Sequence, residues 1–122
     1  MAFSITSAFY LLCAAIALGA ALALPYMHGA VKRLPWLIRV VHGVLGAAGL
    51  AALLLALRSG LPPSAMGTEG FGPAAAGFVA LAFVLGLAIA LFRRRPPGVL
   101  VAAHASLAIA GFVVLWTLAS LG

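Results

Sequence analysis

Residues 41–50 read VHGVLGAAGL, a histidine followed by glycines inside a long apolar run. Residues 103–112 read AHASLAIAGF and repeat its pattern: histidine, leucine three positions later, then Ala-Gly and an apolar residue. The two motifs begin at His42 and His104. An ionisable side chain inside an apolar run is costly in a membrane and indicates a functional site. These two stretches therefore predict both the architecture and the position of its site.

The composition predicts an integral membrane protein. The chain has 122 residues, of which 66% are apolar and 7% are charged. A helix that crosses a bilayer needs about 20 mostly apolar residues, and the chain contains four such runs. We expect one all-α membrane domain over residues 1–122, a four-transmembrane-helix bundle, with the first helix ended by Pro25. The expected helices are residues 3–24, 36–57, 71–92 and 98–121. The single cysteine, Cys13, is expected to be a small buried apolar side chain.

The basic residues lie at the ends of the apolar runs, so the net charge of +6 does not indicate nucleic acid binding. The middle connection carries only Arg58, which Glu69 offsets. The positive-inside rule predicts that the first and third connections are cytoplasmic and that both termini lie outside the inner (plasma) membrane. The clusters are Lys32, Arg33 and Arg39 around the first connection, and Arg93, Arg94 and Arg95 in the third.

The chain also reads as a tandem repeat. Residues 15–24, AIALGAALAL, resemble residues 82–91, AFVLGLAIAL, just as the two histidine motifs resemble each other. Helices one and two would then be a copy of helices three and four, related by an axis along the membrane normal. Such an axis generates a site from two equivalent ligands.

Depth places the two histidines in one layer of the membrane. His42 and His104 are each six residues past the start of their helices, or about 9 Å at 1.5 Å per residue. Gly19 and Gly86, on the other two helices, reach this layer from the opposite direction. Two imidazoles on non-adjacent helices can supply both axial ligands of a haem iron. Glycines on the intervening helices leave room for the flat macrocycle.

We therefore predict one bis-histidine haem b per chain. Helical spacing puts further small residues on the same faces as the histidines, and Arg39 one turn before His42, where it can bind a haem propionate. The glycines are also explained by helix packing alone, and Arg39 by snorkelling to lipid headgroups. The predicted cofactor-binding residues are His42, His104, Gly19, Gly46, Gly49, Gly86, Ala108, Gly111 and Arg39, with His42 and His104 as the metal ligands.

A four-helix bundle with histidine ligands on parallel helices resembles the membrane-embedded b-type cytochromes, such as cytochrome b561 and the anchors of respiratory dehydrogenases. This resemblance rests on His42, His104 and the glycines. It implies electron transfer between a quinone or ascorbate and a partner. The chain departs from cytochrome b561 by having one intramembrane histidine pair instead of two. A single haem near one face implies a quinone, a redox partner subunit or a second copy of the chain as partner.

The histidines also have three alternative roles. The two side chains can form a structural hydrogen-bonded pair, bind a metal ion or relay protons. The corresponding functions are a small four-helix transporter and a cofactor-free structural subunit. Glu69, the single carboxylate, falls in a connection, which argues against cation-coupled export. We expect an electron-transfer protein or subunit in preference to a stand-alone enzyme.

Overall fold

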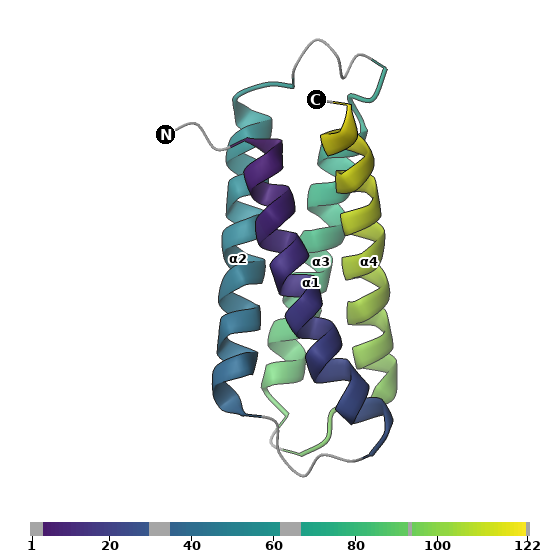
Figure 1. The fold of residues 1–122 in the computed structure, drawn as a ribbon. Coiled ribbons are helices and arrows are strands. Elements are labelled where there is room, and N and C mark those ends of the chain that lie inside the picture. Colours follow the sequence, from purple (N-terminus) through teal and green to yellow (C-terminus); the bar gives the residue numbers. More distant parts are fainter. Residues whose placement is uncertain (1–3, 30–34, 62–66, 93, 122) are drawn as a thin grey trace.

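The computed structural model describes residues 4–29, 35–61, 67–92 and 94–121. In these residues the chain forms a bundle of four antiparallel α-helices (Figure 1). The helices are α1 (Ile5–Met27), α2 (Trp36–Arg58), α3 (Phe71–Ala90) and α4 (Gly98–Ser120). Each is long and apolar enough to cross a membrane. The predicted all-α class and four spans are confirmed, and the chain is a multi-pass membrane protein by length and composition.

The structure corrects three sequence-based expectations: where the first helix ends, where the third helix ends, and whether Cys13 is buried. Helix α1 does not end at Pro25 but continues to Met27. Proline lacks only its own N–H, and the final turn is held by the backbone N–H of His28, which donates to the carbonyl of Leu24 at 3.2 Å. Helix α3 ends earlier than expected, at Ala90. Cys13 is exposed on α1, not buried, because it faces outward from a bundle whose outer surface is apolar.

The four helices form a ring in chain order. Contacts are closest within the hairpin of α1 and α2 and within the hairpin of α3 and α4, and they are fewer where α1 meets α4 and α2 meets α3. Helices α2 and α4 are therefore diagonal neighbours across the bundle axis, as are α1 and α3. Both termini lie at one end of the bundle (Figure 1). We call this the terminal end, and the opposite end, which carries the α1–α2 and α3–α4 connections, the connection end.

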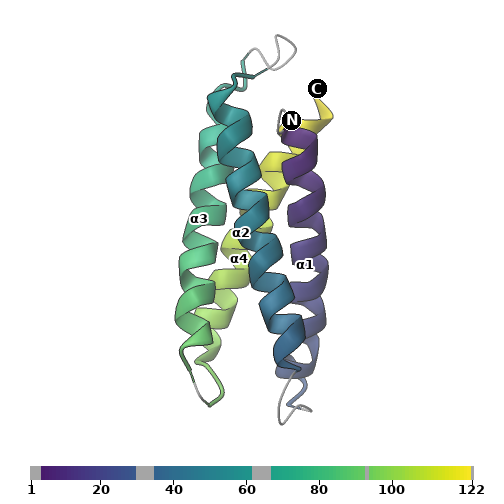
Figure 2. The same ribbon diagram turned by 90° about the vertical axis from the view of Figure 1, so that its left-hand side faces the viewer.

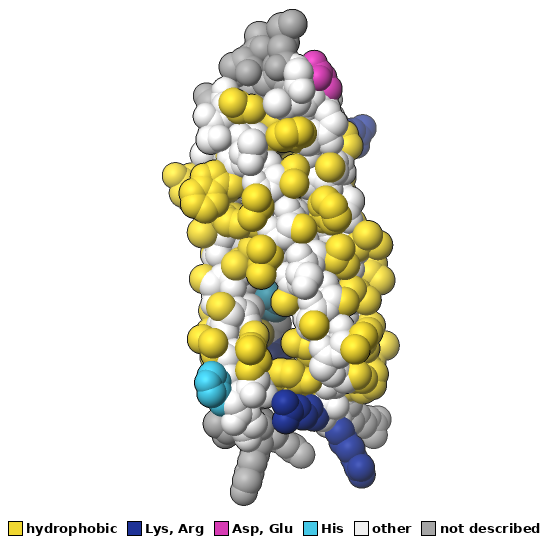
Figure 3. All heavy atoms as spheres, turned by 90° about the vertical axis from the view of Figure 1, so that its right-hand side faces the viewer, with side chains coloured by type: hydrophobic (Ala, Val, Ile, Leu, Met, Phe, Trp, Pro, Cys, Tyr) yellow, Lys and Arg dark blue, Asp and Glu magenta, His cyan; other side chains and the backbone are white. Residues whose placement is uncertain are grey.

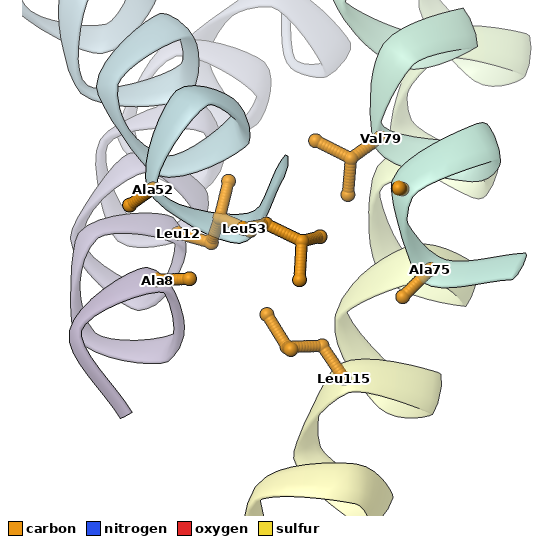
Figure 4. Close-up of a cluster of buried hydrophobic side chains, with 8 residues drawn as sticks. Ala8, Leu12, Ala52, Leu53, Ala75, Val79 and Leu115 are labelled. Atoms are coloured by element: carbon orange, nitrogen blue, oxygen red, sulfur yellow. The ribbon is translucent and has the colours of Figure 1, made fainter. Parts of the chain in front are cut away.

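The close-packed core occupies only the terminal half. Leu53 of α2 and Leu115 of α4 are fully buried on the axis, with Leu12 and Val79 beside them (Figure 4). Phe9 of α1 stacks on Phe112 of α4, with ring centres 5.2 Å apart, and joins the two hairpins in this half. The buried residues are Ala8, Leu12, Ala15, Gly49, Ala52, Leu53, Ala56, Gly72, Ala75, Ala76, Val79, Ala82, Gly111, Leu115 and Leu118.

The core agrees with the tandem repeat. A Cβ atom at Gly49 would lie 2.6 Å from Cγ of Leu12, and one at Gly111 would lie 2.8 Å from Cγ2 of Val79. Leu12 and Val79 occupy equivalent positions when residues 15–24 are aligned with 82–91. Each hairpin therefore uses a glycine in its second helix to bring the first helix close, which is the usual way that bare helices pack in lipid.

Gly49→Ala tests this packing. We expect the added methyl group to overpack against Leu12 and to destabilise the folded bundle by about 1–3 kcal/mol. The matched control is Gly43→Ala on the same helix, since nothing lies within 4 Å of a Cβ atom at that position. Thermal unfolding in detergent measures the difference. Leu12→Ala should restore part of the stability of Gly49→Ala, and equal stability of the Gly49 and Gly43 variants would contradict the packing role.

The connection half is packed differently. The two hairpins lie apart towards this end, where α2 separates from α3 and α1 from α4 (Figure 2). None of the described helical residues after Ala15 in α1, before Gly49 in α2, after Ala82 in α3 or before Gly111 in α4 is buried. Figure 3 shows a hollow in this half, with a histidine side chain visible inside it. The bundle therefore contains a slot between its hairpins.

Candidate functional site

Each histidine of the predicted pair is bound within its own hairpin. Nδ1–H of His42 on α2 donates to the carbonyl of Ala15 on α1 at 2.8 Å. Nδ1–H of His104 on α4 donates to the carbonyl of Ala82 on α3 at 2.7 Å. The two bonds occupy equivalent positions in the repeat. Because each Nδ1 donates to a backbone carbonyl, the tautomer and orientation of both rings are set, and Nε2 is the nitrogen left to bind a ligand.

The two imidazole rings face each other across the bundle axis. Their centres are 6.0 Å apart and their planes make an angle of 81°. A metal bonds an imidazole nitrogen at about 2 Å, and the ring centre lies roughly 1 Å further away, so two rings on one metal ion have centres roughly 6 Å apart. The 6.0 Å between the ring centres of His42 and His104 is therefore compatible with both imidazoles binding one metal ion.

The open ring nitrogens are accessible from the slot. Both histidines are only half-buried, and no hydrogen bond in the described part of the chain engages either Nε2. Among the described residues, no buried side-chain nitrogen or oxygen lacks a hydrogen-bond partner. The Nε2 atoms are therefore accessible and are not sealed in the core.

Gly19 and Gly86 lie against the histidines, as their predicted depth requires. A Cβ atom at Gly19 would be 3.0 Å from Cε1 of His42, and one at Gly86 would be 3.0 Å from Cε1 of His104. Any larger side chain at Gly19 or Gly86 would push the imidazole ring away from the helix that carries the glycine. The glycines are thus needed for the position of the imidazoles, whereas the sequence pattern favoured a role in clearing space for the macrocycle.

The remaining predicted residues divide into three groups. Gly49 and Gly111 are buried against Leu12 and Val79, so their surroundings explain them by helix packing. Gly46 has nothing within 4 Å of a Cβ atom, and its equivalent, Ala108, is half-buried. One turn from the histidines, these two positions line the slot. Arg39 is exposed near the start of α2, one turn before His42, and its side chain makes no hydrogen bond or ion pair with the described residues.

The donor set favours haem iron over a bare metal ion. In residues 4–29, 35–61, 67–92 and 94–121, no three histidine, cysteine, aspartate or glutamate side chains come together in one place. A structural zinc site takes four protein ligands and a catalytic site usually three. A haem iron needs only two axial ligands, because the macrocycle supplies the others. A pair of facing imidazoles and an apolar slot therefore fit a haem.

Sequence reasoning missed one set of contacts near the slot. The hydroxyl of Tyr26 donates to the carbonyl of Pro96 at 2.8 Å, and Nη2 of Arg95 donates to the carbonyl of Tyr26 at 3.0 Å. These residues join the end of α1 to the α3–α4 connection. The expected end of the helix at Pro25 would have put Tyr26 in a loop. A tyrosine and an arginine at the ends of two apolar runs were the only signals in the sequence.

The fold and the site together define a four-helix membrane bundle with one pair of facing histidines in a slot between two repeated hairpins. No protein-family model matches the chain, and no significant match was found among curated proteins or solved structures. A proposal for the function therefore rests on the site alone.

Proposed function

We propose that the protein is a membrane electron-transfer protein that binds one b-type haem between α2 and α4. The observation that carries the proposal is the 6.0 Å separation of the His42 and His104 rings, each held by a backbone carbonyl. Gly46 and Ala108 would lie beside the macrocycle, and Gly19 and Gly86 keep the two rings in place. Arg39 at the connection end is the described cation nearest in sequence to His42, and it would pair with propionates.

The residues of the chain determine how such a haem behaves. Haem iron supplies one-electron chemistry when bound. His42 and His104 would both bind the iron, so the site would serve electron transfer and not oxygen binding. The hydrogen bonds from Nδ1 to Ala15 and Ala82 increase the basicity of the imidazoles, which favours the ferric state. The alanine and leucine side chains around the slot would lower the polarity of the site and favour the less charged state.

The position of the site implies a redox partner. The histidine layer lies in the connection half of the bundle, so a single haem there cannot span the membrane by itself. A quinone, a partner subunit or a second copy of the chain would complete the route. Bilayer lipid would surround the apolar outer surface of the helices.

We further propose that the connection end is cytoplasmic in an inner membrane. Arg94 and Arg95 lie at this end, and the terminal end carries Glu69 and Arg58 (Figure 3). A single cysteine introduced at exposed Met27, in a Cys13→Ala background, should be protected from an impermeant thiol reagent in whole cells and labelled after lysis. A cysteine at exposed Leu121 should react in whole cells. The reverse pattern would invert the topology.

A reduced-minus-oxidised absorption spectrum of the protein purified in detergent tests the function. We expect a sharp α-band typical of six-coordinate b-type haem, and pyridine extraction should give one haem per chain. Protein that stays free of haem, even after expression with haem supplied, would contradict the proposal and leave a structural subunit as the simplest function.

A proton-coupled transporter is less well supported. Glu69 lies outside the helices, and the backbone N–H of Gly67 donates to its Oε1 at 3.0 Å. This hydrogen bond lowers the pKa of the Glu69 carboxyl, so the group stays ionised at neutral pH. No described transmembrane segment contains a carboxylate that could exchange a proton for cargo.

A further inference from the structure

Contacts among Tyr26, Arg95 and Pro96 join the two hairpins at the connection end, and we call them the tie. Tyr26, in the last turn of α1, donates its hydroxyl proton to the carbonyl of Pro96. Arg95 donates to the carbonyl of Tyr26, and its guanidinium carbon lies 4.4 Å from the centre of the tyrosine ring. One aromatic side chain thus takes part in a hydrogen bond and a cation–π contact with the other hairpin, and its own carbonyl accepts a further bond.

The tie joins the hairpins at the end of the bundle that the core does not reach. The hairpins are joined at the terminal end by the core and by the Phe9–Phe112 stack. They separate towards the connection end (Figure 2), and no described helical residue in that half is buried. Tyr26 is seven residues, or about two turns, beyond Gly19, which lies in the histidine layer. The histidines therefore lie between the core at the terminal end and the tie at the connection end.

We propose that Tyr26 is a positioning residue that, with Arg95, sets the width of the histidine slot. The core alone would let the hairpins pivot about the terminal end. Because His42 belongs to one hairpin and His104 to the other, such a pivot changes the distance between their rings. The tie holds that distance at a value suitable for two axial ligands. Its effect on haem rests on the proposed function, but its effect on slot width does not.

The slot has two edges, one between α1 and α4 and one between α2 and α3, and the tie acts on the first. It joins α1 to the connection before α4, whereas no side-chain hydrogen bond links α2 to α3 in the described part of the chain. The α2–α3 edge is therefore the sensitive place to measure slot width. Leu37, near the start of α2, and Leu91, at the end of α3, are exposed there and can carry probes without touching the tie.

Tyr26→Phe removes the hydroxyl and keeps the ring, and Arg95→Lys keeps the charge and removes the planar guanidinium. The matched control is Tyr10→Phe, an exposed tyrosine near the other end of the same helix. Spin labels at Leu37→Cys and Leu91→Cys, in a Cys13→Ala background, report the distance between hairpins without any cofactor. We expect a longer and broader distance distribution in both tie variants and no change in the control.

Haem retention gives the second readout. With the protein loaded, we expect Tyr26→Phe to transfer haem to an excess of an apoglobin about fivefold faster than the wild type, in line with the loss of one hydrogen bond. We also expect carbon monoxide to bind the reduced variant, because a wider slot frees one axial position. A general loss of stability would not by itself produce this spectroscopic change, and Tyr10→Phe should show neither effect.

The outcomes separate the two proposals. Unchanged label distances in Tyr26→Phe and Arg95→Lys would overturn the tie, whatever the haem content. Wider distances with unchanged haem transfer and carbon monoxide binding would overturn the positioning role. If the wild type binds no haem, the proposed function fails, and a wider slot in both variants would still support Tyr26 as the residue that sets slot width.

Discussion

We expect His42→Ala and His104→Ala each to lower haem affinity by at least about 100-fold, since removal of an outer-shell partner alone typically costs 10–100-fold in metal affinity. Each variant loses one of the two imidazole rings whose centres lie 6.0 Å apart across the slot. The remaining histidine keeps its hydrogen bond to the neighbouring helix, so insertion and helix packing should be retained. Pyridine extraction of the purified variants, with circular dichroism for helix content, measures both effects.

The third histidine provides the control for this experiment. His28 is exposed at the end of α1, where its Nδ1–H donates to the carbonyl of Leu24 at 2.7 Å. Its bond resembles those of the pair, but it lies outside the slot. His28→Ala should keep full haem content and an unchanged spectrum. Full haem content in either His42→Ala or His104→Ala would refute the ligand assignment, and loss of haem in all three variants would indicate a general defect in assembly.

The histidine pair could be predicted because its position depends only on regular features of helices. A constant rise per residue sets depth, and the tandem repeat requires that equivalent residues share a layer. His42, His104, Gly19 and Gly86 satisfy both conditions, and the structure brings each glycine against one histidine. The diagonal placement of α2 and α4 follows from a ring of four antiparallel helices joined by short connections.

Some features depend on how the helices cross, which periodicity does not specify. Gly49 and Gly111 share helical faces with the histidines, yet the crossing of each hairpin buries them against Leu12 and Val79. Tyr26 was missed for a different reason. Its partners are the carbonyl and guanidinium of a connection between two other helices, and the path of that backbone cannot be read from residue spacing.

We expect enlargement of the glycines behind the histidines to have the second large effect. Even Gly86→Ala places a Cβ atom 3.0 Å from Cε1 and 3.3 Å from Nδ1 of His104, so the ring must shift by a few tenths of an ångström. Leucine adds three more carbon atoms in the same direction and should break the hydrogen bond to Ala82. We expect about a tenfold loss of haem affinity for alanine and loss of haem binding for leucine, in line with the cost of removing partners that orient a metal ligand. Gly19→Leu should do the same through His42.

The control for bulk on the same helix is Gly77→Leu, because Gly77 is exposed and nothing lies within 4 Å of a Cβ atom there. It should keep haem and helix content. The graded comparison also separates the two roles that the glycines can have. If they only leave room for the macrocycle, a small methyl group should be tolerated. If they position the imidazoles, as the 3.0 Å approach to both rings indicates, alanine should already weaken binding, equally at Gly19 and Gly86. Equal haem affinity in Gly86→Ala and the wild type would therefore favour clearance over positioning, and haem retained in both leucine variants would remove the glycines from the site.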